Sequence, residues 1–273
     1  MALIPPFFLD CVVAIGLLAS NGTKEWVASG FLFGEFVERK SPTEATYRVY
    51  LVTNRHVFEG LQTAYVRFNP EANEPAREFD LQLHDPDGKL KWVAHPDHTI
   101  DIAITPINVA LLKEQHIKFS WFQGDQHVMD RKKANELGLS EGDGVYVLGF
   151  PMGLVGGERN YVIVRQGTIA RIRDALAGSS KEFLIDSTIF PGNSGGPVVT
   201  RPEITAIQGT QSSSAAHLIG VVKAYIPYRE LAISAQTKQP RIMFEENSSL
   251  ASIIPIDFVR ETIEEYLKTQ KAN

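Results

Sequence analysis

One serine among three glycines, in the run Gly192 to Pro197 (GNSGGP), constrains this chain more than any other stretch. A serine hydroxyl is a poor nucleophile at neutral pH, so a catalytic serine needs a nearby general base and donors that stabilise an oxyanion. Gly192 allows a tight turn in which its own N–H and that of Ser194 point to one spot, and Gly195 and Gly196 keep side chains out of the substrate's path. The alternative is an ordinary glycine-rich hairpin. The residues upstream decide between the two.

Two partners for the serine precede it in the chain. The segment Tyr47–Thr53 alternates and is rich in β-branched and aromatic residues, which predicts a strand, and His56 follows it closely. The apolar run from residue 100 to 104 contains one acid, Asp101. A buried carboxylate is costly unless it is paired, and an imidazole N–H is its usual partner in a hydrolase. His56, Asp101 and Ser194 therefore follow the chain order of a known catalytic triad.

Several motifs resemble those of chymotrypsin-fold (trypsin-like) serine peptidases, and most of all the bacterial HtrA-like protease domain. They are, in chain order, Ser29–Leu32, Val52–Val57, Asp101–Ile104, Gly142–Pro151, Asp186–Ile189, Gly192–Pro197 and Ile219–Val222. The resemblance implies an all-β fold of two antiparallel six-stranded β-barrels with a C-terminal α-helix. Residues 1–135 would form the first barrel, with the histidine and the aspartate, and residues 136–273 the second, with the serine and the helix. Many HtrA-like proteases append a peptide-binding PDZ domain, and none is expected after the helix here.

The pattern of short strands agrees with a barrel fold. Short β-like runs separated by Gly, Pro, Asn and Asp favour antiparallel barrels over a βαβ protein. Glu35–Thr46 is expected to be an exposed loop, and residues 109–140 to connect the barrels, with a short helix over Asp130–Leu137. Asp257 begins an amphipathic pattern that predicts a helix packed on the second barrel. Asp10–Gly16 is interpreted as a first strand rather than as part of a secretion signal, because the N-terminus lacks a basic region.

Composition limits the partners and the compartment. The 273 residues are 44% hydrophobic and 22% charged, as in an ordinary soluble globular protein. The net charge of −5, without a basic block, argues against a nucleic-acid partner. The single cysteine, Cys11, excludes an internal disulfide. A cytoplasmic protein without a membrane segment is expected, and a periplasmic or secreted location stays open.

The predicted mechanism needs no metal or organic cofactor. His56 takes the proton of Ser194 and passes it to the leaving amine, while Asp101 accepts the other imidazole N–H. The turn Gly192-Asn193-Ser194 forms the oxyanion hole, through the amides of its first and last residues. A zinc site at His95 and His98 is not expected, since further ligands are missing. The remaining histidines are interpreted as surface residues; they are His84, His116, His127 and His217.

The substrate is expected to be a protein or peptide. The resemblance implies that the primary specificity pocket is lined by Thr188, Ile189, Lys223, Ala224 and Tyr225. Thr188 stands where a trypsin-like enzyme carries an acid, and bulky Tyr225 narrows the pocket. A small or medium apolar residue on the acyl side of the cleaved bond is therefore expected.

Regulation and oligomeric state are less determined. Asn193 replaces the aspartate that pairs with a freed N-terminus in digestive relatives, so activation by N-terminal cleavage is not expected. The oxyanion turn is instead ordered by substrate or by a partner that touches a loop such as 153–160 or 173–181. The sequence does not indicate whether the chain is a monomer or a homo-oligomer.

Two alternatives stay open. The first is a catalytically silent peptide-binding protein on a peptidase scaffold, because a fold does not imply a function. A complete set of triad residues argues against it. The second is an esterase, but the acid of such an enzyme follows the serine, whereas Asp101 and His56 both precede Ser194.

Overall fold

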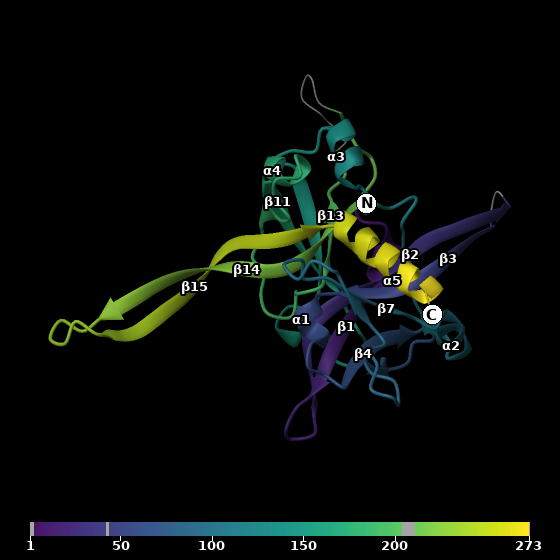
Figure 1. Ribbon diagram of the computed structural model, residues 1–273, viewed down its shortest axis with the longest axis horizontal. Coiled ribbons are helices and arrows are strands. Elements are labelled where there is room, and N and C mark those ends of the chain that lie inside the picture. Colours follow the sequence, from purple (N-terminus) through teal and green to yellow (C-terminus); the bar gives the residue numbers. More distant parts are fainter. Residues whose placement is uncertain (1–2, 42–43, 204–210, 273) are drawn as a thin grey trace.

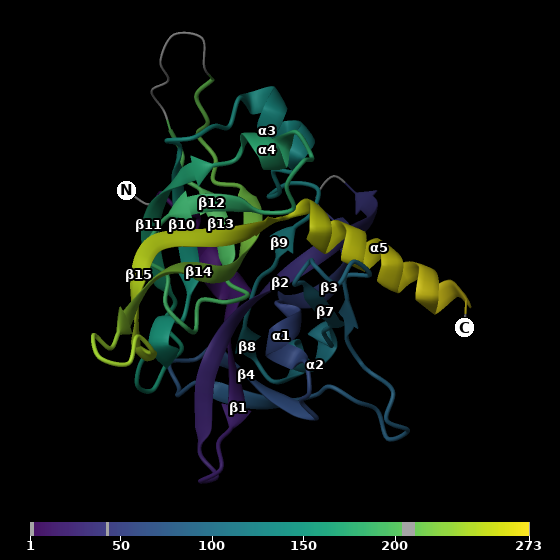
Figure 2. The same ribbon diagram turned by 60° about the vertical axis from the view of Figure 1, so that its left-hand side comes forward.

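The chain folds into two β-structures, one from each half of the sequence, joined by short helices and covered by a C-terminal helix (Figures 1 and 2). The computed structural model describes residues 3–41, 44–203 and 211–272. The expected all-β fold with a terminal helix is confirmed. The division expected between residues 135 and 136 falls inside helix α3 (Arg131–Leu137), between the two β-structures.

Among the described residues, the N-terminal half forms a nine-stranded sheet in the order β5-β4-β1-β2-β3-β7-β6, with β8 paired to β4 and β9 to β2. Its strands are β1 (Val12–Leu18), β2 (Lys24–Ser41), β3 (Glu44–Thr53), β4 (Thr63–Pro70), β5 (Arg77–Gln82), β6 (Val93–Ala94), β7 (Ala103–Pro106), β8 (Ile117–Lys118) and β9 (Phe122–Gln123). The strand β1 bears out the interpretation of the N-terminal run, and a short 3-10 helix, η1 (Pro6–Cys11), precedes it. The loop expected over Glu35–Thr46 is wrong for all the described residues of that range, because β2 continues to Ser41 and β3 begins at Glu44.

The N-terminal sheet curls without closing into a continuous ladder. Among the described residues, the two end strands, β5 and β6, are linked only through the segment between them, by a bridge between His84 and Leu90 and by hydrogen bonds of 2.9 Å from Lys91 N to Leu83 O and from Asp85 N to Lys89 O. The chain reverses between them in a tight turn at Asp85, whose carboxylate accepts the amides of Asp87 and Lys89. The first six-stranded barrel is therefore present as a curled sheet.

The C-terminal half forms a closed barrel in the order β10-β11-β12-β15-β14-β13. Its strands are β10 (Gly144–Gly149), β11 (Ile163–Arg171), β12 (Phe183–Asp186), β13 (Pro197–Thr200), β14 (Leu218–Ile233) and β15 (Pro240–Pro255). All neighbouring pairs are antiparallel. The interior is apolar and includes Val147, Ile185, Val198 and Ile253.

Strands β14 and β15 extend well beyond this barrel as a two-stranded ribbon, which projects from the body in Figure 1. Their pairing continues from Gly220 and Pro255 in the barrel out to Ile233 and Pro240. The sequence did not predict this ribbon, because the outer residues of β14 and β15 do not alternate cleanly between polar and apolar.

The helices are short, apart from the last. They are α1 (Arg55–Phe58), α2 (Val109–Glu114), α3, α4 (Arg173–Leu176) and α5 (Asp257–Ala272), with a further 3-10 turn η2 (Pro151–Gly153). The expected helix after Asp130 is confirmed, and the Asp130 side chain caps it by accepting the amide of Lys133 at 2.9 Å.

Helix α5 packs across the N-terminal sheet as well as against its own barrel, so its expected position is wrong in part. The ring of Phe258 lies edge-on to His95, with ring centroids 5.6 Å apart, and that of Tyr266 lies edge-on to Tyr50 at 5.8 Å. A buried cluster that contains Phe31 and Ile102 from the N-terminal half also contains Val259 and Ile254. The helix is apolar on the face that covers this shared core, so it buries more apolar surface across the junction than on one barrel alone.

Candidate active site

The candidate base, His56, lies on the one-turn helix α1, directly after strand β3. The residue before this helix, Asn54, is fully buried and donates its side-chain amide to Asp101 O at 2.8 Å. This bond ties the start of α1 to the loop before β7. The His56 side chain is 51% exposed, so a substrate can reach it.

Asp101 is held against His56 by two hydrogen bonds. Its Oδ2 lies 2.6 Å from His56 Nδ1, and its Oδ1 accepts the His56 backbone N–H at 3.0 Å. Burial alone would raise the pKa of this carboxyl, but the hydrogen bonds and charge of His56 outweigh burial, and the pKa lies below its ordinary value. Asp101 is therefore an ionised acid that orients the imidazole through Nδ1 and leaves Nε2 for chemistry.

The turn around Ser194 requires glycine at two positions. Gly192 has φ +98° and Gly195 has φ +82°, conformations that L side chains rarely adopt. A Cβ on Gly192 would lie 2.3 Å from Phe150 O, and one on Gly195 would lie 2.2 Å from Thr53 Oγ1. The glycines let the turn pack closely on the end of strand β3.

Two backbone amides of this turn have no acceptor within the described part of the chain, those of Gly192 and Ser194. The carbonyl of Pro191 accepts the Met152 amide at 2.6 Å. Because C=O and N–H point in opposite directions across a trans peptide, the Gly192 N–H is directed away from that contact. Asn193 donates its N–H to Phe190 O at 3.0 Å, so Asn193 shapes the turn. The predicted oxyanion residues thus provide two unpaired donors, as an oxyanion site requires.

The serine itself is half-buried. Over residues 3–41, 44–203 and 211–272, the Ser194 hydroxyl makes no hydrogen bond, and none joins it to His56. Its backbone is fixed, because Ser29 N donates to Ser194 O at 2.9 Å and Gly195 N donates to Val222 O at 2.9 Å. Catalytic hydrogen bonds are often long in unliganded enzymes and shorten when substrate binds.

Ser29 is a buried residue that the sequence analysis did not assign to the site. Its hydroxyl donates to Gly192 O at 2.7 Å and accepts the Phe150 amide at 2.9 Å, while its carbonyl accepts the Thr53 hydroxyl at 2.8 Å. One side chain of the N-terminal sheet thereby holds the serine turn of the C-terminal barrel. Its place in the Ser29–Leu32 motif was the available signal.

The five residues predicted to line the specificity pocket lie on two segments, each of which is hydrogen-bonded to β15. Ile189 is buried, and its carbonyl accepts the Asn247 side-chain amide at 2.5 Å. The Thr188 and Ser249 hydroxyls lie 3.3 Å apart. On β14, Ala224 is exposed and the Tyr225 hydroxyl donates to Glu245 Oε1 at 2.7 Å. Asn247 was missed because β15 itself was not predicted.

Lys223 is paired, which limits its part in substrate binding. Its Nζ lies 2.5 Å from Glu182 Oε1, and the other oxygen of Glu182 accepts the Ser252 hydroxyl. The Lys223 charge also contributes to the lowered pKa of Asp101, after the effects of His56. Glu182 was not singled out in the sequence, because a single acid in a polar loop carries no signal.

Two of the other histidines, His95 and His217, are buried. His95 is buried, accepts the Asp97 amide at 3.0 Å and lies 3.3 Å from Glu261 Oε2. Within the described ranges no cluster of three or more His, Cys, Asp or Glu side chains is placed to hold a metal ion. The surface interpretation of His217 is wrong, because only 8% of its surface is exposed, and it lines a cavity together with residues of the N-terminal segment. Burial and then the charge of Lys133 lower its pKa to about 4.

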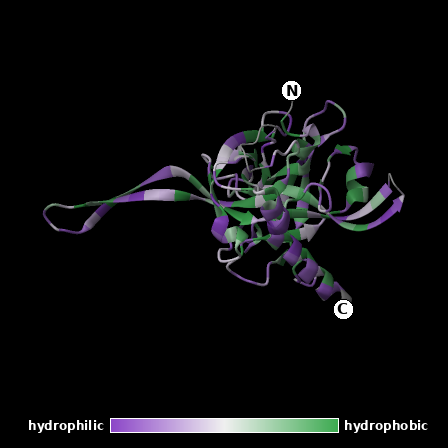
Figure 3. Ribbon diagram, turned by 90° about the horizontal axis from the view of Figure 1, so that it is seen from above, coloured by the Kyte–Doolittle hydropathy of each residue, from purple (hydrophilic) through white to green (hydrophobic). Residues whose placement is uncertain are grey.

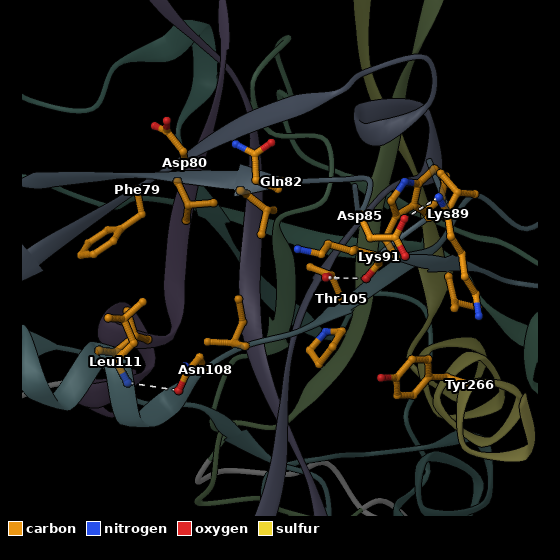
Figure 4. A pocket seen from close by; sticks show the side chains of 18 of the residues that line it. Phe79, Asp80, Gln82, Asp85, Lys89, Lys91, Thr105, Asn108, Leu111 and Tyr266 are labelled. Atoms are coloured by element: carbon orange, nitrogen blue, oxygen red, sulfur yellow. Dashed lines mark hydrogen bonds between the residues drawn. The ribbon is translucent and has the colours of Figure 1, made fainter. Parts of the chain in front are cut away.

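One cavity lies away from these residues. It has a volume of about 870 Å³ and lies between β5, β6, β7 and helices α2 and α5 (Figure 4). Its lining includes Phe79, Leu111 and Tyr266 but none of the predicted site residues. It is the opening left where β5 and β6 separate.

In the part of the chain that the structure describes, no helix is long and apolar enough to cross a membrane.

A comparison with models of protein families identifies the family of the chain. The family model described as trypsin-like peptidase domain matches residues 28–203, more than half of the chain. No curated protein matches. The MamO protease domain from Magnetospirillum magneticum, in its apo form, is 18% identical, with 93% of this chain and 96% of that chain covered and a TM-score of 0.48. A mutant, inactive form of Rv3671c from M. tuberculosis H37Rv is 15% identical, with 96% and 89% covered and a TM-score of 0.46.

Proposed function

Because the chain belongs to the trypsin-like peptidase domain family, we propose that it is a serine endopeptidase with His56, Asp101 and Ser194 as its triad. The observation that carries the proposal is the contact of 2.6 Å between His56 Nδ1 and the buried carboxylate of Asp101. Such a pair has little structural purpose on an exposed imidazole, but it is what a general base requires.

In this mechanism, His56 Nε2 removes the Ser194 proton as the hydroxyl oxygen attacks the peptide carbonyl. The negative charge that develops on the carbonyl oxygen is stabilised by the unpaired amides of Gly192 and Ser194. His56 then protonates the leaving amine, and the acyl-enzyme is hydrolysed by water in the same sequence of proton transfers. Asp101 remains deprotonated throughout the cycle and stabilises the imidazolium form of His56.

The proposed preference is for a small or medium apolar residue on the acyl side of the cleaved bond. Thr188 carries no charge, and the nearby acid Glu182 is already paired with Lys223. A cationic side chain would therefore find no free carboxylate on these residues. A peptide library dominated by cleavage after Arg or Lys would contradict the preference.

The test is labelling with a fluorophosphonate probe, which reacts with an activated serine. Wild type, Ser194→Ala and His56→Ala are compared, and the modified peptide is mapped by mass spectrometry. An adduct on Ser194 that is lost in both variants is expected. A folded wild type that takes up no label would refute the proposal.

A catalytically silent peptide-binding protein is the second candidate. The observation that favours it is the Ser194 hydroxyl, which makes no hydrogen bond to His56 among residues 3–41, 44–203 and 211–272. This candidate predicts no labelling of Ser194 but retained binding of extended peptides, with equal affinity in wild type and Ser194→Ala.

A further inference from the structure

The ribbon of β14 and β15 has no core of its own. We call residues 226–247 the arm; it extends freely from the barrel in Figures 1 and 3. A two-stranded hairpin is at best marginally stable alone in water. Because the arm contributes no core, its exposed surface is the feature that can serve a function.

That surface is unusually apolar. Six large hydrophobic side chains of the arm are each between 48% and 61% exposed, namely Tyr228, Leu231, Ile233, Ile242, Met243 and Phe244. Directly paired residues share a face, so Leu231 and Met243 lie together on one face, and Phe244 lies opposite Glu230 on the other. An apolar surface of this kind on a soluble chain indicates a binding site.

The arm is continuous with the serine turn. Val222 on β14 accepts the Gly195 amide and donates to Gly196 O, both at 2.9 Å. Beyond Val222, no strand among the described residues pairs with the outer edge of β14. Asn247, at the base of the arm, holds Ile189 O just before the turn. A chain lying along this edge therefore leads directly to Ser194.

The direction of the edge selects one side of the substrate. Lys223 to Tyr225 belong to the proposed acyl-side pocket, so the residues before the cleaved bond continue outward along β14. The strand from Lys223 to Ile233 is about 36 Å long at about 3.3 Å per residue, which matches an extended segment of about eleven residues. Pro227 has no N–H and interrupts backbone pairing, so the apolar side chains must supply much of the contact.

The charge of the arm fits an apolar partner. It carries three basic residues, Arg229, Lys238 and Arg241, and three acids, Glu230, Glu245 and Glu246. Arg229 and Glu245 are already paired at 2.9 Å. A balanced arm gives no field that would attract a strongly charged segment.

We infer that the arm binds an extended, apolar segment of the protein substrate on the acyl side of the cleaved bond, well upstream of the specificity pocket. This inference rests on the proposed endopeptidase function. It makes the enzyme selective for unfolded or extended chains, because a folded substrate cannot lie along both the arm and the serine turn.

The experiment compares two peptides with the same four residues before the cleaved bond, one of which carries eight further apolar upstream residues. Wild type is expected to cleave the longer peptide with a KM at least about tenfold lower. The double variant Ile242→Ser/Phe244→Ser is expected to lose this advantage while cleaving the short peptide within about threefold of wild type. The control is Leu18→Ser, an equally exposed hydrophobic side chain on the β1–β2 hairpin, which should behave as wild type.

Equal KM values for the two peptides in wild type would overturn the inference, as would an arm variant that keeps the advantage. A change of mass in light scattering on arm mutation, with peptide discrimination unchanged, would identify a second copy of the chain as the occupant and also overturn it. The proposed function is tested separately by fluorophosphonate labelling. If labelling fails, the two peptides are made with a fluorophore, and their binding to Ser194→Ala decides whether the arm still selects the longer peptide.

Discussion

At the scale of single residues, Asp101 keeps its charge in a setting where burial favours the neutral acid. Burial raises its pKa, and the hydrogen bonds from His56 reverse the effect. A carboxyl with a pKa below its unfolded value stabilises the fold above that value and loses the contribution as pH falls through the folded pKa. The contact of 2.6 Å with Nδ1 therefore serves both stability and the proposed proton transfer.

Asp101→Asn is expected to lower kcat by about ten-thousandfold, because an amide no longer holds the tautomer that leaves Nε2 free to accept a proton. Steady-state kinetics on an accessible peptide measure the loss. The matched control is Asp97→Asn, an acid in the same loop that pairs with Lys181 and Thr99 instead of the imidazole. It should stay within about threefold of wild type, and an equal loss in both variants would mean that the loop, not the triad, was disturbed.

His217 is expected to make stability pH-dependent. Its pKa of about 4 lies below the ordinary value of 6.5, so the folded state prefers the neutral ring. The contribution of the neutral ring to the free energy of unfolding should be complete above about pH 6.5. The free energy of unfolding should then fall by up to about 3 kcal/mol as the pH is lowered to about 4. Urea unfolding at several pH values measures this slope. His217→Gln should flatten it, whereas His116→Gln, at an exposed site, should not change it.

At the scale of elements, the serine turn depends on backbone conformation more than on side chains. Gly192 places its amide through a positive φ, and the space where a Cβ would stand is filled by Phe150 O. The turn is held from three sides, by η2, by β2 and by β14. Its geometry is thus a property of neighbouring elements.

Gly192→Ala is expected to reduce fluorophosphonate labelling of Ser194 by at least about a hundredfold, because the shifted turn moves an oxyanion donor. Strain at positive φ and the clash should also lower stability by about 1–3 kcal/mol. Gly157→Ala is the control, since a Cβ there meets nothing within 4 Å. Unchanged labelling in Gly192→Ala would show that its amide is not a donor to the oxyanion.

At the scale of the whole molecule, the two β-structures are joined by a shared core and by one buried hydroxyl. Ser29 of β2 contacts Gly192 and Phe150 of the other half. Helix α5 covers the same junction with Val259 and Ile263. The site is therefore assembled only when both halves are packed together.

Ser29→Ala is expected to lower stability by about 1–3 kcal/mol, because Gly192 O and the Phe150 amide lose their partner in a buried site. The looser turn should lower kcat more than it raises KM, since the defect lies at the oxyanion donors. Thermal unfolding and steady-state kinetics measure both effects. Ser212→Ala, at an exposed position, is the control and should change neither.

Much of this protein was predictable from the sequence alone. The pattern of short strands predicted the all-β fold, Asp130 located α3, and the glycines around Ser194 identified the serine turn. These features are local, because the pattern of side chains in a strand, a helix cap and a positive φ are all properties of neighbouring residues. That Asp101 needs a partner also followed from local sequence, since a buried acid in an apolar run must be paired.

Tertiary structure decided what local sequence could not specify. Three features depend on residues more than a hundred positions away. They are the role of Ser29, the burial of His217 and the position of α5 across both halves. The arm escaped prediction because its two strands stabilise each other by pairing, while their exposed faces carry no periodic burial. The sequence determined which chemical groups were available, and packing determined which of them meet, because burial and long-range pairing arise only between segments brought together by the fold.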